Sequence, residues 1–550
     1  MTKPQNSTIS DVSELKRDDA VAPQVGRPAF PQLANAAADL KLYDTASHTV
    51  SQFEPIKPGQ VGIYVCGATV QSSPHIGHIR AAVAFDIIRR WFERLGYQVT
   101  FVRNVTDIDD KILDKSAAAG QQWWQRAYLY EREFTKAYDE LGVEPPTYEP
   151  RATGHMMDMV ALIQRIIDNG HAYVVRDEQG NPTGNVYFDV ASWPHYGELT
   201  HQKQSEPGAQ IDAVDVELDE AARVADAMGP SVDTAGNDKY NPVDPADMSP
   251  DKHDPRDFAL WKAPKDTDPV DARWHTPFGE GRPGWHIECS AMSHRYLDGM
   301  FDIHGGGLDL RFPHHENEMA QTCAAGYDSA ARWMHSAWVT AKGEKMSKSL
   351  GNGLSVPVVL AEHPAWVVRY ALGGVQYRSM LEWSDQTLAE ATAAYERVTN
   401  FISRAEDVLG EQIDRDQIVA VGADDLPIDF TNAMNEDINV SGALAAIFTA
   451  IRNGNALMDA NADAAQVRES LLQVRAMLDT LGLDPEAEPW AQETSNAANE
   501  VLDRLIATQL EARAEARKAK DFATADAIRD ALAAAGITIE DTPQGPTWSI

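Results

Sequence analysis

Residues 61–103 decide the fold of this chain and read VGIYVCGATVQSSPHIGHIRAAVAFDIIRRWFERLGYQVTFVR. The run 61–66 is short, apolar and rich in β-branched residues, which is typical of a buried strand. From Pro74 onward apolar residues recur mostly at three- and four-residue intervals, which predicts a helix that ends at Gly96. Residues 98–103 predict a second strand. A strand, a helix and a strand at this spacing predict a βαβ unit, and therefore a parallel sheet.

The composition of the 550-residue chain is that of a soluble, globular and acidic protein. A hydrophobic share of 43% is enough to build cores, which excludes a largely disordered chain. No apolar run approaches the ~18–20 residues that span a bilayer, and residues 1–20 lack the apolar stretch of a signal peptide. We therefore expect a cytoplasmic protein. The 83 acidic and 48 basic residues give a net charge of −35, which argues against binding nucleic acid or an anionic membrane by bulk attraction.

Composition also marks segments outside the sheet. Residues 1–38 mix proline and polar residues without apolar periodicity, which predicts a flexible extension. Residues 141–265 resemble an insertion between two halves of the sheet, and within it residues 198–257 hold 15 acidic and 5 basic residues, as a solvated loop would. The pattern is helical from about residue 355 to about residue 535, with an acidic break at 414–429 that predicts a linker.

The first motif with chemical meaning is Pro74-His-Ile-Gly-His78, at the start of the predicted helix. His75 and His78 are three residues apart, so both imidazoles lie on one helix face at its N-terminal end. That end carries partial positive charge and free amide donors, which suits a phosphate-bearing ligand. Gly77 removes a side chain where a flat base can approach the backbone. Two surface or metal-binding histidines are the alternative, and the position after a strand favours the phosphate site.

The second motif is Gly343-Glu-Lys-Met-Ser-Lys-Ser-Leu-Gly-Asn-Gly353, which places Lys345 and Lys348 with hydroxyl residues between glycines. Such a loop can fold over a polyphosphate, where ammonium groups offset the charge that grows during nucleotidyl transfer. A solvated basic loop is the alternative. The pentapeptide Lys-Met-Ser-Lys-Ser together with Pro-His-Ile-Gly-His is the paired signature of class I aminoacyl-tRNA synthetases, and the chain resembles that family.

A third constellation combines thiols with a histidine and a carboxylate. His314 and Glu318 are four residues apart, one helical turn, so both can reach one ion. Cys66 closes the first strand, and Cys289 lies in the phrase Gly-Trp-His-Ile-Glu-Cys-Ser. Two thiolates, one imidazole and one carboxylate form a coherent zinc set, although inert buried thiols are the alternative. His315 is the competing ligand and is expected to point elsewhere on the helix.

The three cysteines of the chain are too few and too scattered for a disulfide framework. A reduced compartment fits this pattern, and so does metal binding by single thiols. Cys323, the third of them, is expected to be a core thiol.

The chain further resembles the cysteinyl-tRNA synthetase family over residues 40–550 apart from the acidic segment. The phrases that carry the resemblance are Tyr64–Gly67, Pro74–Arg80, Asn104–Lys111, Phe258–Lys262, Gly284–Met292, Asp302–Gly307, Phe312–Glu318, Lys345–Gly351, Glu540–Gly545 and Trp548. The resemblance implies that Cys66, Cys289, His314 and Glu318 bind one Zn²⁺ per chain. It also implies that this zinc accepts the thiol of the cysteine substrate as an additional ligand, whereas four protein ligands normally mark a closed structural site.

The resemblance assigns further roles in substrate binding. It implies that Gly67, Thr69, Thr106 and Trp285 contact the substrate, with Trp285 packed against cysteine and Thr106 helping to hold its amine. A core tryptophan and a helix N-cap are the alternatives for these two residues. The adenosine site is implied at a glycine run and a nearby carboxylate, namely Gly305, Gly306, Gly307 and Asp309. A tight turn would also explain the three glycines.

The activity implied by the resemblance is a two-step ligation. The cysteine carboxylate attacks the α-phosphorus of ATP, which Mg²⁺ accompanies, and the resulting adenylate passes cysteine to tRNA(Cys). His75, His78, Lys345 and Lys348 are expected to stabilise the phosphate charge, and Lys348 also to contact ATP at the pyrophosphate. The family expectation is a monomer.

Two other functions are compatible with parts of the sequence. The same catalytic core can join activated cysteine to an amino-sugar without tRNA, although the long helical C-terminus speaks against this ligase. The second alternative is an inactive protein that binds nucleic acid or is stabilised by zinc. Cysteine-dependent ATP–pyrophosphate exchange separates the second from an active enzyme.

The fold class that follows is α/β, with a Rossmann-like parallel-sheet catalytic domain that an insertion splits and an α-helical anticodon-binding region that follows. The expected segments are an extension at 1–38, the first half of the catalytic domain at 39–140, the insertion at 141–265 with its acidic loop at 198–257, the second half at 266–354, a helical junction at 355–405, an anticodon-binding domain at 406–500 and a tRNA-binding tail at 501–550.

Contacts with tRNA are expected at Arg513, Arg517, Lys518, Lys520 and Trp548, and an ordinary ion-paired helix is the alternative. Binding of tRNA by so acidic a chain must rest on local basic and aromatic surface.

Overall fold

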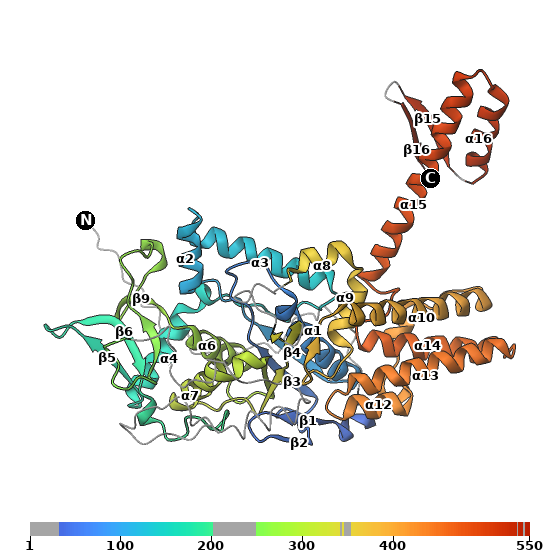
Figure 1. The fold of residues 1–550 in the computed structure, drawn as a ribbon. Helices are drawn as coiled ribbons and strands as arrows, with labels where there is room; N and C mark the ends of the chain where they lie inside the picture. Colours follow the sequence, from blue (N-terminus) through green and yellow to red (C-terminus); the bar gives the residue numbers. More distant parts are fainter. Residues whose placement is uncertain are drawn as a thin grey trace, which may run out of the picture. The chain divides into compact units, whose positions relative to one another are not determined.

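The computed structural model describes residues 32–201, 249–341, 344–345, 354–535, 537–542 and 545–549 (Figure 1). The chain forms two compact units, of which the first ends at Leu483 and the second begins at Asp484. None of the helices in the described part of the chain combines the length and the apolar character that a membrane span needs.

A four-stranded parallel sheet with the order β11-β10-β3-β4 forms the centre of the first unit. Its strands are β3 (Gln60–Val65), β4 (Gln98–Arg103), β10 (Ile303–Gly307) and β11 (Arg332–Ser336). Helix α1 (Ile76–Arg94) connects β3 to β4, and its apolar residues, such as Ile79 and Val83, are fully buried. The predicted βαβ unit and the α/β class are confirmed. Gly305–Gly307 lie inside β10, which excludes the tight-turn alternative.

The insertion contains a second, antiparallel sheet with the order β5-β6-β7-β9-β8. Its strands are β5 (Ala172–Arg176), β6 (Pro182–Phe188), β7 (Phe258–Lys262), β8 (Trp274–Thr276) and β9 (Gly279–Pro283). Before it come α2 (Asp110–Ala118), α3 (Trp123–Glu140) and α4 (Met156–Asp168), and after it α6 (Trp285–Leu297). The expected end of the insertion at residue 265 is too early, because Pro283 of β9 pairs with Trp261 of β7.

Both ends of the expected acidic loop at 198–257 are packed against the protein. Thr200 is buried, and its amide and hydroxyl donate to Glu316 at 2.9 and 2.8 Å. Asp257 is also buried and accepts from the Tyr173 hydroxyl at 2.7 Å. The prediction of a solvated loop is therefore wrong at both ends, where the polar groups find partners inside the protein. The middle of the loop, residues 202–248, lies outside the described residues.

The N-terminal extension is shorter than expected. Residues Asn35–Asp39 form a turn of 3-10 helix, and the amides of Asn35 and Ala36 donate to Asp424 at 2.7 and 2.9 Å. The hairpin of β1 (Lys41–Asp44) and β2 (Thr49–Gln52) follows. The expected boundary at residue 38 misses this order because polar backbone contacts leave no apolar periodicity, and residues 1–31 lie outside the described part.

The rest of the first unit is mainly helical, as predicted. It contains α7 (Glu316–Ala324), α8 (Val356–Glu362), α9 (Ala365–Gly373), α10 (Asp385–Leu409), α11 (Arg415–Ala420), α12 (Ile428–Asn435), α13 (Val440–Asp459) and α14 (Ala464–Thr480). A small sheet of β12 (Val339–Ala341), β13 (Glu344–Lys345) and β14 (Leu381–Glu382) precedes most of them. The expected linker at 414–429 is wrong, since α11 lies within it and packs against α14.

The second unit is an α-helical hairpin followed by a β-hairpin. Its elements are α15 (Trp490–Lys518), α16 (Phe522–Ala534), β15 (Thr538–Thr542) and β16 (Gly545–Ser549). Leu510, Ile506 and Ile537 form a small core within this unit. Helix α15 runs through the boundary expected between residues 500 and 501, so the division of the chain lies earlier than the sequence pattern indicated.

Candidate active site and metal centre

The residues that the sequence singled out gather at the carboxyl edge of the parallel sheet. Cys66 directly follows β3, and its amide donates to the Gly305 carbonyl of β10 at 3.0 Å. Thr106 follows β4, and its amide donates to the Ala68 carbonyl at 3.2 Å. In open α/β sheets ligands bind at this edge, where the strands end and helices begin. The topology thus brings segments about 240 residues apart into one site.

Four buried side chains at this edge can hold one metal ion. Cys66, Cys289, His314 and Glu318 place their ligand atoms within 4.8 Å of one another. The Cys66 sulfur lies 3.2 Å from Glu318 Oε1, and His314 Nε2 lies 3.0 Å from the same oxygen. Soft thiolates with an imidazole and a carboxylate fit zinc, and all four groups are closed off from solvent.

A second set of ligand atoms overlaps with the first. Cys66, His304, His315 and Glu318 also lie within 4.8 Å of one another. His304 Nε2 lies 2.8 Å from Glu318 Oε2, so the two oxygens of this carboxylate face the two sets. His315 Nε2 is buried and has no hydrogen-bond partner among the described residues. The expectation that His315 points away from the site is wrong, because residues Arg311–His315 form an irregular turn with extended backbone at Phe312.

Electrostatics in the cluster favour a bound cation. Burial alone would raise the pKa of the Cys289 thiol, but the neighbouring Cys66 and His314 lower it to about 7. Burial would lower the pKa of His314, whereas Glu318 and Cys289 raise it to about 10. Burial and then the neighbouring Cys289 raise the pKa of Cys66. The cluster therefore holds protons among its ligand atoms, and these are the protons that a metal replaces.

The outer partners of the metal ligands were not predicted. His286 Nδ1 lies 2.9 Å from His314 Nδ1, which leaves His314 Nε2 directed at Glu318. Asn104 Oδ1 lies 3.5 Å from the Cys289 sulfur. A histidine or amide beside a ligand fixes its ring orientation and tunes its basicity. His286 stands three residues before Cys289 in one phrase, which is the signal that could have identified it.

Two of the four predicted contacts for the cysteine substrate, Trp285 and Thr106, lie beside this cluster. The Trp285 ring is partly exposed at the start of α6 and stacks on His314, with centroids 4.2 Å apart. It is thus not a core tryptophan. The Thr106 hydroxyl donates to Glu288 Oε2 at 2.8 Å, while α2 has Asp109 as its N-cap. The N-cap alternative for Thr106 is therefore wrong, and its hydroxyl is held at the site.

The loop after β3 needs glycine at its first position. A Cβ atom on Gly67 would lie 1.6 Å from the Asn104 carbonyl oxygen, so only glycine fits the close approach to the end of β4. The Gly67 amide donates to Asn104 Oδ1 at 2.8 Å. Thr69 forms a backbone bridge with Thr106 across the same gap. Gly67 and Thr69 thereby set the distance between the two strand ends.

The histidine pair lies at the first turn of α1. His75 is the N-cap and Gly77 follows it in the first turn, while the rings of His75 and His78 stack with centroids 3.6 Å apart. The Ile76 amide donates to the Leu354 carbonyl at 3.0 Å, and residues 354–356 thereby bond to the start of the helix. In the sequence these residues directly follow the second signature motif. Lys345 belongs to β13, while Lys348 lies outside the described residues.

The glycine run of β10 packs closely against its surroundings. A Cβ atom on Gly305 would lie 2.1 Å from the Phe85 ring of α1, and one on Gly306 would lie 3.0 Å from the His315 ring. Gly307 ends the strand, and Asp309 follows it in a short turn. The run therefore lies between α1 and the metal cluster, at the place where the resemblance implies adenosine.

Comparison with known families agrees with this arrangement. Residues 52–393 match the model of the class I (C) tRNA synthetase catalytic domain, and residues 429–484 match the DALR domain. Residues 501–548 match the cysteinyl-tRNA ligase anticodon binding domain. The chain belongs to the cysteinyl-tRNA ligase family. The match at 501–548 disfavours the amino-sugar ligase, whose reaction involves no tRNA.

Relatives and solved structures extend this result. The cysteine–tRNA ligase of Bifidobacterium longum is 75% identical over 94% of this chain and 96% of its own length. The cysteine–tRNA ligase of Beutenbergia cavernae is 51% identical over 93% of this chain and 99% of its own length. Methionyl-tRNA synthetase of Mycobacterium tuberculosis with methionyl-adenylate aligns with a TM-score of 0.50 at 16% identity over 77% of this chain and 89% of that one. The Agrobacterium radiobacter K84 agnB2 LeuRS–tRNA–LeuAMS complex aligns with a TM-score of 0.54 at 13% identity, over 80% of this chain and 86% of that one. At such low identities, both structures show a likeness of fold alone.

Proposed function

We propose that this chain ligates L-cysteine to its cognate tRNA through a cysteinyl-adenylate. The observation that carries the proposal is the buried set of Cys66, Cys289, His314 and Glu318, at the same sheet edge where α1 begins with its histidine pair. A thiol-selective metal site beside a phosphate-binding helix end is what activation of cysteine by ATP requires. Membership of the ligase family supports the same reaction.

In the first step a carboxylate oxygen of cysteine attacks the α-phosphorus of ATP, and the bond to the β-phosphate oxygen breaks to release pyrophosphate. His75 and His78 face the transferred phosphate at the N-terminal end of α1, whose partial positive charge stabilises negative charge. Lys345 and Lys348 offset the charge of the leaving pyrophosphate, and Mg²⁺ accompanies the ATP. The adenosine lies along Gly305–Gly307 and Asp309.

Selection of cysteine depends on its sulfur. Cys66, Cys289, His314 and Glu318 would hold a Zn²⁺, and this ion would supply a soft Lewis acid that favours the thiolate of cysteine over the hydroxyl of serine. Trp285 covers the side chain of the substrate beside His314, and Thr106 holds the amine through a hydroxyl that Glu288 orients. A pocket based on shape alone rejects such an isostere by only about 100-fold.

In the second step the terminal ribose hydroxyl of tRNA attacks the carbonyl carbon of the mixed anhydride, and AMP leaves. Holding both reactants in place contributes most to this step. The helices at 406–500 and the tail at 501–550 bind the anticodon arm, with contacts at Arg513, Arg517, Lys518, Lys520 and Trp548. Arg517, Lys518 and Lys520 are exposed near the end of α15, where they are available to phosphates. The protein acts as a monomer in the cytoplasm.

Two assays on the purified protein test the function. We expect cysteine-dependent exchange of pyrophosphate into ATP, and transfer of labelled cysteine to tRNA(Cys). The absence of exchange in zinc-loaded protein would favour an inactive zinc-stabilised protein. Turnover with an amino-sugar and none with tRNA would overturn the proposal in favour of the other ligase.

Single substitutions separate the two overlapping ligand sets. We expect His314→Ala to lose the bound zinc, because the chosen set contains both thiolates and this imidazole. His315→Ala is expected to retain one zinc per chain, since its ring belongs only to the second set. Metal analysis of both proteins after dialysis measures this difference. Loss of zinc from His315→Ala with retention in His314→Ala would assign the ion to the second set.

A further inference from the structure

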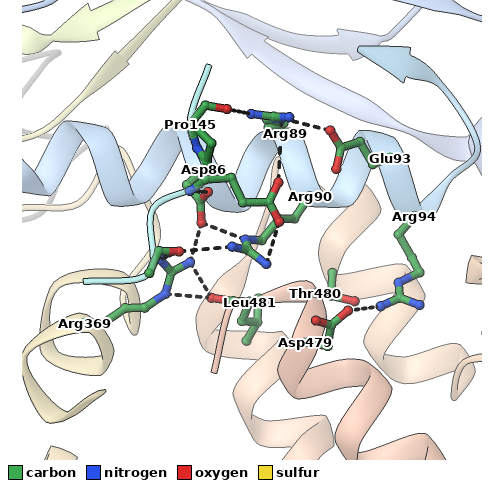
Figure 2. Close-up of polar contacts among 12 residues, drawn as sticks. Asp86, Arg89, Arg90, Glu93, Arg94, Pro145, Arg369, Asp479, Thr480 and Leu481 are labelled. Carbon is green, nitrogen blue, oxygen red and sulfur yellow. Dashed lines mark hydrogen bonds and ion pairs between the residues drawn. The ribbon is translucent and has the colours of Figure 1, made fainter. Parts of the chain in front are cut away.

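Two buried arginines bind the C-terminal ends of three helices. Arg369 of α9 donates to the carbonyls of Leu141 and Gly142, each at 2.9 Å. It also donates to the carbonyl of Leu481 at 2.9 Å (Figure 2). Leu141 is the C-cap of α3, and Leu481 is the C-cap of α14. Carbonyls at a helix end have no partner within the helix and carry partial negative charge, so a guanidinium satisfies both needs.

Arg94, in the last turn of α1, binds the ends of two helices in the same way. It donates to the carbonyl of Ile418 at 3.1 Å and to that of Val421, the C-cap of α11. Its Nη2 atom contacts the Ala476 carbonyl at 3.4 Å, in the last turns of α14. The same nitrogen forms an ion pair with Asp479, which is also in these turns (Figure 2). The end of α14 is thereby bound by both arginines.

Acidic groups complete the two clusters. Asp86 of α1 accepts from Arg90 at 2.7 Å, pairs with Arg369 and accepts from the Glu144 amide at 2.8 Å (Figure 2). Asp479 pairs with Arg94 and with Arg415 of α11. The side chains of Asp86, Asp479 and both arginines are at most 1% exposed. We call these groups the Asp86–Arg369 cluster and the Arg94–Asp479 cluster.

Stability alone does not account for these clusters. Taking a charge pair out of water is costly, and well-packed apolar residues of similar size are often as stabilising or more so. What apolar side chains lack is the ability to bond helix-end carbonyls at fixed positions. Gly482 agrees with a geometric role, since it has a φ of 68° and a Cβ atom there would lie 2.2 Å from the Arg369 guanidinium.

Two of the helices that these contacts join, α1 and α3, also reach the active site. Helix α1 starts at the histidine pair, and Phe134 of α3 packs on the His78 ring with centroids 5.4 Å apart. Helix α14 ends three residues before Leu483, where the first unit stops and the chain continues into the unit with the anticodon-binding match. The same contacts therefore join the helix of the active site to the end of the region that matches the DALR domain.

We propose that the Arg94–Asp479 cluster is a positioning device for the transfer of cysteine to tRNA. It holds the end of α14 at one place on α1, and with it the helices at 429–484 that match the DALR domain and that we propose to contact the tRNA. The inference rests on the proposed function. The Asp86–Arg369 cluster joins α1 to α3 and α9 through contacts that do not involve Arg94, so we expect activation of cysteine to continue without Arg94.

An apolar replacement of the pair tests this role. In Arg94→Met with Asp479→Leu the core stays filled, and Arg415, which is 38% exposed, can turn to water. Because the carbonyls of Ile418 and Val421 lose their donor, we expect a lower thermal midpoint in a protein that stays folded at the assay temperature. We expect unchanged cysteine-dependent pyrophosphate exchange, with kcat/KM for tRNA lowered at least about tenfold. As the control, Asp459→Asn breaks the exposed pair with Arg404 on α10 and α13 and should change none of the three.

Two results would overturn the inference. One is a folded double variant that charges tRNA with the native kcat/KM, and the other is a parallel fall of exchange and charging, which marks a structural role only. Should the double variant fail to fold, Arg94→Lys retains the charge but not the fork that bonds several carbonyls, and native charging by it would have the same meaning. Failure of the proposed function is distinct, because the native protein would then show no exchange.

Discussion

Replacement of Cys289 by serine is expected to lower the affinity for cysteine at least about 100-fold, equivalent to about 2.8 kcal/mol, and to release the bound zinc. The serine hydroxyl does not ionise near neutral pH, whereas neighbouring groups lower the pKa of the Cys289 thiol to about 7. The remaining set would be one thiolate, one imidazole and one carboxylate, which binds zinc more weakly. Cysteine-dependent exchange at a series of cysteine concentrations, together with metal analysis, measures both effects.

Cys323→Ser is the matched control for this substitution. The thiol of Cys323 is partly exposed on α7 and lies in neither ligand set, so zinc content and cysteine affinity should stay at the native values. Loss of zinc from both variants would indicate general destabilisation. Native zinc content and cysteine affinity in Cys289→Ser would show that this thiol is not a ligand.

Local patterns in the sequence were sufficient to predict the parallel sheet. Strand β4 has the predicted bounds Gln98–Arg103, and α1 ends near the predicted Gly96, because one buried strand and one amphipathic helix leave clear periodic signals. The insertion boundary was missed for a physical reason. β9 returns to pair with β7 across about 20 residues, and pairing between distant segments leaves no mark in local periodicity.

The candidate site was predicted in part. His314 and Glu318 are one helical turn apart and meet in the cluster, but the backbone turns irregularly just before α7 and brings His315 to the same carboxylate. His304 joins from β10, ten residues earlier, through a contact that only the folded sheet creates. A pattern of residue types can predict ligands that share one helix. Ligands that come from different elements can be identified only from the tertiary structure or from a family resemblance.

Buried arginines were also outside the reach of sequence patterns. Arg94 and Arg369 occupy positions where charge normally indicates exposure, yet both are buried because helix-end carbonyls and carboxylates surround them. A composition count treats each as one positive charge. Only the fold reveals that their charges are neutralised inside the protein and unavailable to nucleic acid.

Gly67→Ala is expected to lower kcat/KM for pyrophosphate exchange at least about 100-fold, which is the cost of displacing reacting groups by about 1 Å. The new Cβ atom would lie 1.6 Å from the Asn104 carbonyl oxygen, and a backbone atom cannot rotate away. The strand ends must separate, which moves Thr106 and the amide beside Cys289. Overpacking of this kind also lowers the free energy of unfolding by about 1–3 kcal/mol, which chemical denaturation measures.

Gly154→Ala provides the control for this substitution, because a Cβ atom at Gly154 meets nothing within 4 Å. Its exchange rate and its unfolding free energy should equal those of the native protein. The two readouts on Gly67→Ala then separate position from stability. A protein that is folded at the assay temperature and still exchanges pyrophosphate slowly would locate the loss in the displaced strand ends. Native exchange by Gly67→Ala would show instead that the gap between β3 and β4 can widen without moving the substrate, and that the close approach at Asn104 does not set the geometry of the site.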